Sequence, residues 1–495
     1  MSYIGKQPLV TPSSFTANAS GTISDGDTCV VNSNGTVSKV FQNFTPTNPQ
    51  TLGTAATVST GGGSYNSATA TNGSDTVLHV FAGTSSYVSV IAGTVGSGNA
   101  TPSYGTEVSV TSQACKSTSV VYLGSNKWVI GFAFGTNDIG LRVATVSGTT
   151  VTLGTARQYW GYGNVIRLAY DTNESQFLAI YRNTSSSNRL DGVIFTVSGT
   201  TITLNTGNIT NIESSGINDG DQPMGVTYDT NADRFAVVYE TSSQLKARVI
   251  NNVNNSLTIG SQTTVSTRNV GGNSIDVAYD NSSQKHLIVY NDDANSPYLG
   301  YGKVATVDPS DNSISFGTEG SITTGNHSFN NVGIDVDNTH GKIVLAYRIY
   351  SSADSIEDGY VNTVTISGTT FSIGTQVEYQ SGDTRGNSIG SFGDGRAVVF
   401  GHPTNWISRT TTYSTLSANL TAENFIGISN GAYADGASAT VQLSGAVDDA
   451  QSGLTAGQQY FVQANGSLGT TADDPSVIAG VALSATEIAI DTSRD

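Results

Sequence analysis

Short apolar runs recur along the chain at a nearly constant spacing, and each run ends in an aromatic residue. The runs end at Phe81, Phe132, Tyr181, Tyr239, Tyr290, Tyr347 and Phe400, which are 49 to 58 residues apart. A nearly continuous apolar run of this length is typical of a strand buried on both faces. Sheets repeated about every 50 residues indicate a β-propeller rather than a solenoid. The spacing predicts seven blades, with six or eight as alternatives because the first and last repeats diverge.

In three copies the apolar run follows another strand that ends in Tyr-Asp and a short polar turn. These copies cover residues 166–181, 224–239 and 275–290. An Asp in such a turn accepts hydrogen bonds from backbone two residues on and closes the hairpin without glycine. We therefore interpret Asp171, Asp229 and Asp280 as turn residues, although Asp229-x-Asn231-x-Asp233 also resembles part of a calcium loop that lacks its Gly and distal Glu.

A second repeated motif consists of a large residue, then Gly or Asn, then Thr or Ser. It covers residues 52–54, 104–106, 153–155, 204–206, 259–261, 316–318 and 373–375. The first copy precedes every inner hairpin, whereas the last hairpin, near 389–400, leads to a strand around 407–414 without a motif of its own. Residues 50–58 are therefore predicted to supply the outer strand of the last blade, which would close the ring and remove its free edge.

The segments on either side of the repeats have a different pattern. Residues 1–49 and 416–495 both place Asp-Gly before a Val/Thr strand and Asn-Gly in a hairpin turn. Neither is long enough to be a convincing domain alone. We expect them to form one small split β domain, with a four-stranded-blade propeller at 50–415 inserted into it.

Composition agrees with an all-β protein and narrows its partners. Charged residues make up 12% of the chain and there are 56 glycines, a mixture that favours strands and tight turns. The formal charge of −17 repels phosphate backbones and anionic lipid, so we expect neither nucleic acid nor membrane insertion. Cys29 and Cys115 have no metal-type spacing and are expected to be buried free thiols, and the N-terminus lacks an export signal, which together suggest synthesis in a reducing cytoplasm.

The C-terminal run 424–490, with DDAQSGLTAGQQYFVQANGSLGTT and VIAGVALSATEI, resembles a small β module of structural proteins of tailed, notably marine, bacteriophages. ISDGDTCVVNSNGTVSKV, near the N-terminus, is similar to the opening half of that module. The resemblance covers about a quarter of the chain. It implies a place in a virion assembled in the host cytoplasm, contact with other virion proteins through the split domain, and a multimer in the particle. It does not distinguish tail from head.

No catalytic constellation accompanies these patterns. The five histidines are scattered, and His79 and His286 lie within apolar strands, so we expect them to be packing residues. No nucleophile elbow, P-loop or dinucleotide fingerprint is present. Propellers also serve glycosidases, which generally need two carboxylates across the scissile bond, and unrepeated carboxylates do occur in loops. The sequence nevertheless predicts a protein without enzymatic activity, cofactor or metal.

Loop residues that could bind a ligand are the remaining candidates. Aromatic rings stack on sugar faces, and Arg, Asn and Asp bond to sugar hydroxyls. The candidate binding residues are Trp160, Tyr162, Arg182, Arg348, Tyr350 and Trp406. The alternative is that the aromatic residues only fill gaps between blades.

Three functions follow from this reading. The first is a tail-fibre or tail-tip adhesin that binds a host-surface glycan or protein. The second is an architectural head decoration or connector protein, and the third is a glycan depolymerase.

Overall fold

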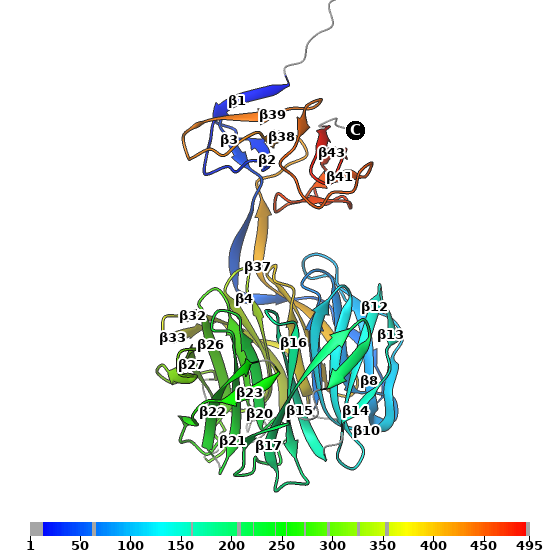
Figure 1. The fold of residues 1–495 in the computed structure, drawn as a ribbon, viewed down its shortest axis with the longest axis vertical. Helices are drawn as coiled ribbons and strands as arrows, with labels where there is room; N and C mark the ends of the chain where they lie inside the picture. The colour runs from blue at the N-terminus through cyan, green and yellow to red at the C-terminus, as the bar shows by residue number, and fades with distance from the viewer. Residues whose placement is uncertain are drawn as a thin grey trace, which may run out of the picture. The chain divides into compact units, whose positions relative to one another are not determined.

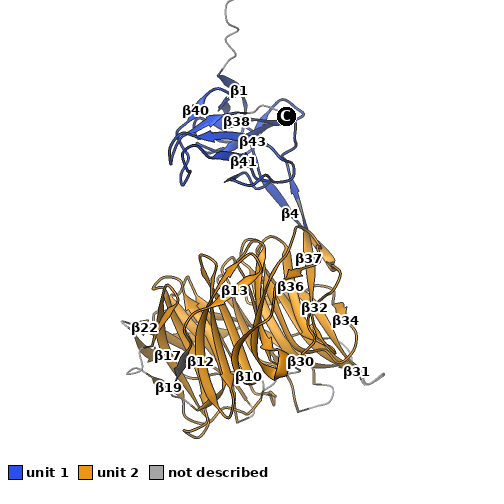
Figure 2. Cartoon of the chain, turned by 90° about the vertical axis from the view of Figure 1, so that its right-hand side faces the viewer, with its two compact units in different colours: residues 1–45, 415–495 blue, residues 46–414 orange. Residues whose placement is uncertain are grey.

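The alternating apolar runs and polar turns fold into an all-β structure, shown in Figure 1. The computed structural model describes residues 13–491 except 62–65, 160–161, 205–208, 221, 243, 254, 272–273, 295–297, 324–326 and 352–355. Within these ranges the only helical element is one 3-10 turn, Thr84–Ser86, and none is long and apolar enough to cross a membrane. The chain divides into two compact units, residues 1–45 with 415–495 and residues 46–414 (Figure 2).

Unit 1 contains two five-stranded antiparallel sheets. One has the order β1-β39-β38-β2-β3, so it mixes strands from both ends of the chain, and Cys29 of β2 pairs with Gly427 of β38. Its strands are β1 (Ser14–Asn18), β2 (Thr28–Val31), β3 (Val37–Lys39), β38 (Phe425–Ser429) and β39 (Ser438–Gln442). The other sheet, β40-β44-β43-β41-β42, consists of β40 (Val447–Asp448), β41 (Gln459–Val462), β42 (Leu468–Gly469), β43 (Ile478–Ala482) and β44 (Ile488–Ile490).

Unit 2 begins with a nine-stranded sheet in which β8 and β10 join two antiparallel groups. Its strands are β6 (Ser67–Thr71), β7 (Thr76–Ala82), β8 (Tyr87–Thr94), β9 (Ser103–Tyr104), β10 (Val108–Gly124), β11 (Lys127–Phe134), β12 (Asp138–Ser147), β13 (Thr150–Leu153) and β14 (Arg157–Tyr159). Cys115 of β10 is half-buried, whereas Cys29 of unit 1 is fully buried.

Five further sheets in unit 2 each have five strands and repeat one topology. The third to fifth groups are β15 (Gly163–Asp171), β16 (Gln176–Asn183), β17 (Arg189–Ser198), β18 (Thr201–Leu204), β19 (Thr210–Glu213); β20 (Met224–Asp229), β21 (Arg234–Thr241), β22 (Gln244–Val253), β23 (Ser256–Ile259), β24 (Thr263–Ser266); and β25 (Asp276–Asp280), β26 (Lys285–Asn291), β27 (Gly300–Asp308), β28 (Ser313–Phe316), β29 (Gly320–Ser321).

The last two sheets differ in where their outer strands come from. One contains β30 (His327–Asp337), β31 (Lys342–Ser351), β32 (Ile356–Ser367), β33 (Thr370–Ile373) and β34 (Val377–Gln380). The other contains β35 (Arg385–Ser391), β36 (Arg396–His402) and β37 (Trp406–Ala418), completed by β4 (Gln42–Leu52) and β5 (Ala56–Ser59). In this sheet Ile407 pairs with Thr57, so the segment expected to supply an outer strand does pair with the strand after the last hairpin.

The apolar runs lie between neighbouring sheets. Each of β7, β11, β16, β21, β26 and β36 is buried along nearly its whole length, which confirms the prediction of strands covered on both faces. The innermost strands contact one another in the circular order β6, β10, β15, β20, β25, β30, β35 and back to β6. The individual sheets are open, and together they form a propeller-like arrangement.

The predicted turn residues have the predicted role. The Oδ1 atom of Asp229 accepts hydrogen bonds from the backbone N–H groups of Asn231 and Ala232, at 3.0 and 2.8 Å. Asp171 and Asp280 make the corresponding bonds in their own turns. The other oxygen of Asp229 lies 3.0 Å from Nε2 of the fully buried His286, in the next sheet. His286 thus links its own sheet to the turn of the preceding one.

The glycine of the repeated motif is explained by contact with the adjacent sheet. A Cβ at Gly317 would overlap the carbonyl oxygen of Thr369, in the β32–β33 hairpin, and one at Gly260 would overlap the corresponding oxygen of Asn312. At Gly53, a Cβ would lie 2.5 Å from the carbonyl oxygen of Asn99, which connects the last sheet to the first. Glycine is therefore required because a neighbouring backbone approaches closely.

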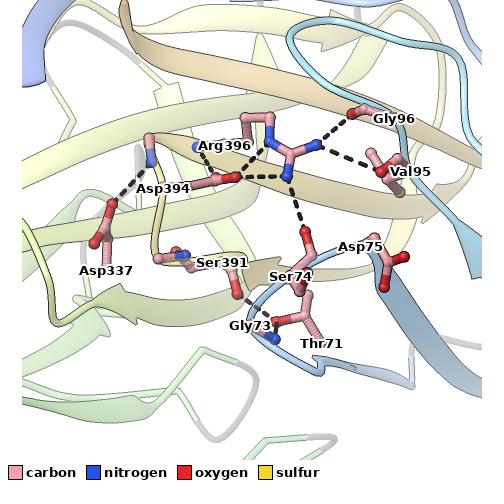
Figure 3. A network of polar contacts seen from close by, with 12 residues as sticks. Thr71, Gly73, Ser74, Asp75, Val95, Gly96, Asp337, Ser391, Asp394 and Arg396 are labelled. Atoms are coloured by element: carbon pink, nitrogen blue, oxygen red, sulfur yellow. Dashed lines mark hydrogen bonds and ion pairs between the residues drawn. The ribbon is translucent and has the colours of Figure 1, made fainter. Parts of the chain in front are cut away.

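A second contact between the last and first sheets centres on Arg396 (Figure 3). Its guanidinium donates hydrogen bonds to the carbonyl oxygens of Ser74, Val95 and Gly96 in the first sheet, and its Nε donates to Asp394 in its own sheet. The Arg396 side chain is only 11% exposed. One arginine therefore links two segments about 300 residues apart in the sequence.

Candidate binding site on the loop face

We define the loop face as the end of the unit 2 sheets that carries the connections between second and third strands and between successive sheets. It is opposite the Asp turns, because connections in an antiparallel sheet alternate between its two ends. The sequence predicted the binding residues at this face. Trp160 lies outside the described residues, and the others fall into three separate places.

Tyr162 and Arg182 lie close together at the loop face of the sheet that contains β15 and β16. The Tyr162 side chain is 63% exposed, and its backbone carbonyl accepts a hydrogen bond from the N–H of Thr184. Arg182 is buried and donates to Asn164 Oδ1 at 3.1 Å and to Asp219 Oδ1 at 2.7 Å. Tyr162 is thus available for stacking, whereas Arg182 acts as the support that holds the exposed carboxylate of Asp219.

Arg348 and Tyr350 belong to β31, in a different and non-adjacent sheet. Arg348 is buried, and its guanidinium lies 2.6 Å from Glu357 and 3.6 Å from Asp383. Tyr350 is half-buried. Glu357 lies in β32 of the same sheet, and Asp383 lies in the segment between this sheet and β35 of the next one. The Arg348 guanidinium is therefore held by carboxylates of the protein itself.

The structure corrects the prediction for Trp406. Its side chain is fully buried, its ring stacks on Phe400 with centroids 4.8 Å apart, and its Nε1–H donates to the carbonyl oxygen of Ala82 at 2.8 Å. The residue starts β37 and packs between the last and first sheets. Trp406 therefore fills a gap between sheets and presents no ring to a ligand.

A basin that the sequence did not predict opens between the sheets of β22 and β27. Its volume is about 730 Å³, and its lining consists of residues 264–269 with Asp292, Ala294, Lys303 and Glu319. Thr264, Thr267 and Asn269 are exposed. We call this the Arg268 basin.

Arg268 is fixed from three sides. Its guanidinium bonds to Asp292 Oδ2 and Glu319 Oε1, each at 2.8 Å, and lies 3.8 Å over the ring of Tyr301. Tyr290 donates to the other oxygen of Glu319 at 2.5 Å. Burial raises the pKa of Glu319, but hydrogen bonds from Arg268 and Tyr290 outweigh it and hold that pKa below its ordinary value.

The charges of the basin are therefore balanced and pre-oriented. Lys303 adds a second cation, and its Nζ donates to the carbonyl oxygen of Val265 at 2.7 Å. With two cations, two carboxylates and exposed hydroxyl and amide groups, the basin offers hydrogen-bond donors and acceptors in fixed positions without a strong net charge. Such a lining suits a polyhydroxylated ligand.

A repeated pattern could have revealed part of this basin. The residue after the Gly-Thr/Ser motif is Gln262, Glu319 or Gln376 in three successive copies, and each bonds to the aromatic residue that ends the apolar run in the second strand of its sheet. Aligning the two repeat series would have paired Glu319 with Tyr290. The position of Arg268 has no such signal, because it lies in an irregular connection.

Comparison with known proteins identifies no family. No family model and no curated protein matches the chain. A solved structure from Lactobacillus plantarum has a TM-score of 0.48 at 10% identity, covering 66% of this chain and 88% of that one. Aleuria aurantia lectin in complex with Fucα1-6GlcNAc scores 0.41 at 14% identity, covering 63% and 95%, and the Dos1 propeller scores 0.41 at 10%, covering 82% and 90%. Likenesses at this level carry no argument about function.

Proposed function

We propose that this chain is a non-enzymatic structural protein of a tailed-bacteriophage particle whose unit 2, a closed seven-bladed propeller, binds a host-surface glycan through its loop face. The Arg268 basin is the observation that carries the binding part of this proposal. The phage part is supported by the resemblance of residues 424–490 to a phage β module.

The seven-bladed ring is supported by contacts that repeat at successive seams. Seven inner strands contact one another in a circle, and β6 and β10 are two of the seven. These two strands begin separate blades even though pairing between β8 and β10 joins their groups into one sheet. The motif glycines Gly53 and Gly317 both pack on a turn of the next sheet, and Gly53 does so between the last sheet and the first. The seam at the chain ends thus uses the same contact as an internal seam.

Glycan binding is supported by the chemistry of the loop face. The Arg268 basin provides fixed polar groups, and Tyr162 provides an exposed ring elsewhere on the same face. Sugar recognition uses both features, because hydroxyls need oriented partners and sugar faces stack on aromatic rings. The acidic chain, at −17, would disfavour strongly anionic polysaccharides over neutral ones.

Attachment to other virion proteins is assigned to unit 1. Val447, Val481 and Leu483 are 46, 39 and 52% exposed there. Val447 and Val481 both pair with Ala489, on either side of β44, so they lie in one row across the sheet. An apolar row of this kind suits contact with another protein, and an architectural role in the head or at a connector would use the same contact.

The proposal is tested by binding of the full chain to host cells and to a panel of host-surface glycans. Thr267→Ala and Asn269→Ala remove exposed basin groups, and each is expected to weaken binding about 2- to 10-fold through the loss of one hydrogen bond. Thr258→Ala, on the exposed outer strand β23, is the matched control and should bind like the wild type. Equal binding by all variants refutes the basin as the site.

Two further results separate the alternative functions. Absence of binding to cells and glycans, together with a position on the capsid lattice in electron microscopy of the particle, would favour the architectural role. Release of reducing sugar from host polysaccharide would identify a depolymerase instead.

A further inference from the structure

Unit 1 contains two copies of one five-stranded module. The first module has the strand order β1-β39-β38-β2-β3, and the second has β40-β44-β43-β41-β42. Counted along the chain within each module, both orders are first, fifth, fourth, second, third. The chain leaves the first module after β3 to form unit 2 and returns in β38, whereas residues 470–477 join the same two strands directly in the second module.

The pairing registers of the two modules match. Thr28 of β2 pairs with Ile428 of β38. At the corresponding place, Gln459 of β41 pairs with Val481 of β43. In both sheets the register shifts between the second and third pairs. The similarity therefore extends to single residues and is not limited to the order of strands.

Two local features repeat as well. Gly427 and Gly480 occupy the same position of the fourth strand, and a Cβ at either would overlap a carbonyl oxygen of the fifth strand. In the hairpin between the second and third strands, Asn34 and Asn465 each accept a hydrogen bond from the backbone N–H two residues ahead, at 3.1 and 3.0 Å. Each residue of one module thus has an identifiable counterpart in the other.

The second module covers one face of the first. We call this face the outer face of a module, and in the first module it consists of Thr28, Val30, Phe425 and Ile428. All four of these side chains are buried. The three apolar ones share a core with Tyr460, Val462 and Ile488 of the second module. The outer face of the first module is therefore an interface within unit 1.

The second module approaches this face with a different surface, the side that carries its Asn-Gly hairpin. Thr28 Oγ1 donates a hydrogen bond to the carbonyl oxygen of Gly466 at 2.8 Å, and a Cβ at Gly466 would overlap the carbonyl oxygen of Val40. Gln451 Nε2 donates to the carbonyl oxygen of Gly26 at 2.9 Å. We call this surface the hairpin side. The two modules thus pack head to tail, the outer face of one against the hairpin side of the other.

The outer face of the second module is uncovered in the chain. It consists of Gln459, Phe461, Ile478 and Val481. Val481 is 39% exposed, whereas its counterpart Ile428 is completely buried. Val447 extends this face through its pairing with Ala489, and it is also exposed. An apolar surface that is buried in one module is therefore open in the other.

The hairpin side of the first module is open too. A Cβ at Gly35 would meet no atom of the described residues within 4 Å, in contrast to its counterpart Gly466. Gly457 is equally open, whereas its counterpart Gly26 lies against the second module. Unit 1 consequently has one free surface of each kind. A head-to-tail contact with a free surface at both ends can be repeated by another molecule.

We propose that unit 1 of a second copy of this chain places its free hairpin side on the outer face of the second module, so that the contact between the two modules is repeated between chains. Gln459 of one chain then lies beside Gly35 of the next, as Thr28 lies beside Gly466 within the chain. The chain carries both halves of this contact, which favours a second copy over an unrelated protein. The inference rests on the proposed attachment role of unit 1 and names the partner.

Self-association of the full chain is measured by sedimentation velocity over a range of protein concentrations. We expect reversible association in the micromolar range, because the contact between chains lacks the covalent link that holds the two modules together within a chain. Val481→Glu places a charge on the outer face and should weaken association about 100-fold. Val253→Glu, at an exposed valine of β22 in unit 2, is the matched control and should associate like the wild type. Unfolding curves verify that both variants are folded.

Cysteine cross-linking tests the head-to-tail geometry. Ser33→Cys lies in the hairpin of the first module and Gln459→Cys on the outer face of the second, both at exposed positions. A mixture of these two single variants should form a cross-linked dimer with a short bis-maleimide, whereas neither variant alone should do so. Cys29 is buried and Cys115 half-buried, so the wild type treated in the same way gives the background.

The inference is overturned if the chain stays monomeric at every concentration, or if Val481→Glu associates as the wild type does. Cross-linking of Gln459→Cys with itself would show two outer faces in contact and would also overturn it. Glycan or host-cell binding by a chain that stays monomeric rejects this inference alone, and association without any such binding rejects the proposed glycan binding alone.

Discussion

Replacing Arg396 with alanine removes the hydrogen bonds that one guanidinium makes across the seam between the last and first sheets. Three carbonyl oxygens of the first sheet, those of Ser74, Val95 and Gly96, lose their charged donor, and Asp394 loses its ion-pair partner. The contact joins β36 to turns of the first sheet, near β7 and β8. The chain itself joins these two sheets only through β5, which leads into β6, so the substitution weakens the side-chain link between the first sheet and the C-terminal strands of the last one.

The expected loss can be worked out from these contacts. A hydrogen bond to a charged group contributes roughly 1.5–3 kcal/mol when buried. The bonds to Ser74 and Gly96 lie at the surface, where water can replace the lost donor, and only the bond to Val95 is partly buried. We therefore expect a loss of about 2 kcal/mol in the free energy of unfolding, equivalent to a few degrees in the midpoint of thermal unfolding.

Two internal controls share the strand position of Arg396. Arg234 is the first residue of β21, and it donates to Asn312 Oδ1 at 2.6 Å and to the Pro309 carbonyl at 3.0 Å in the next sheet. Lys342 is the first residue of β31, but its Nζ bonds to Thr365 within its own sheet. Arg234→Ala should resemble Arg396→Ala in the midpoint, and Lys342→Ala should change it less.

Hydrogen exchange followed by mass spectrometry distinguishes the two seams. Arg396→Ala should increase exchange in the first and last sheets, whereas Arg234→Ala should increase it in the sheets of β21 and β27. If Arg396→Ala leaves both the midpoint and the exchange unchanged while Arg234→Ala lowers protection, the seam is not formed in solution and the ring closure inferred from it is wrong.

Three other changes have defined outcomes. Gly317→Ala should destabilise unit 2 by about 1–3 kcal/mol in denaturant unfolding, since its Cβ would overlap the Thr369 carbonyl oxygen, and an unchanged midpoint would show that the hairpin moves aside freely. Burial raises the pKa of Asp276 from 3.8 to about 7, so the folded state binds the proton more tightly than the unfolded state; stability should fall as pH rises from about 4 to 7, and Asp276→Asn should flatten that decline in unfolding curves taken across this range. Deleting residues 1–58 removes β4 and β5, the partners of β37, and should prevent soluble expression, whereas a stable monomer of residues 59–415 would contradict this.

The sequence was most informative where a local rule repeats. Asp229 could be interpreted as a turn residue because an Asp side chain bonds to backbone only two and three residues ahead, whatever surrounds it. The apolar run around His286 predicted a buried strand because an unbroken apolar run is typical of a strand covered on both faces. Trp406 was misplaced because its sequence neighbours resemble a loop, whereas the direction of its side chain is set by the pairing of β37 with β5.

The polar sites could not be predicted because no local pattern brings their residues together. Residues of seven inner strands, from Ser67 in β6 to Ile389 in β35, line one cavity of about 170 Å³, and only the circular arrangement of these strands brings them together. Arg268 likewise meets Glu319 across two sheets. The repeats predict the strands and turns of each sheet. The contacts near the axis and between sheets depend instead on residues that differ from one repeat to the next.

This difference between local and circular contacts makes a last prediction. The Arg268 basin is lined by residues from only two neighbouring sheets, and the Arg396 contacts lie between the last sheet and the first. Arg396→Ala should therefore leave glycan binding that depends on Thr267 at its wild-type affinity, although it lowers the midpoint of thermal unfolding. If calorimetry shows this affinity falling in the folded variant, the seam acts on the whole unit, and the basin is not structurally independent of ring closure.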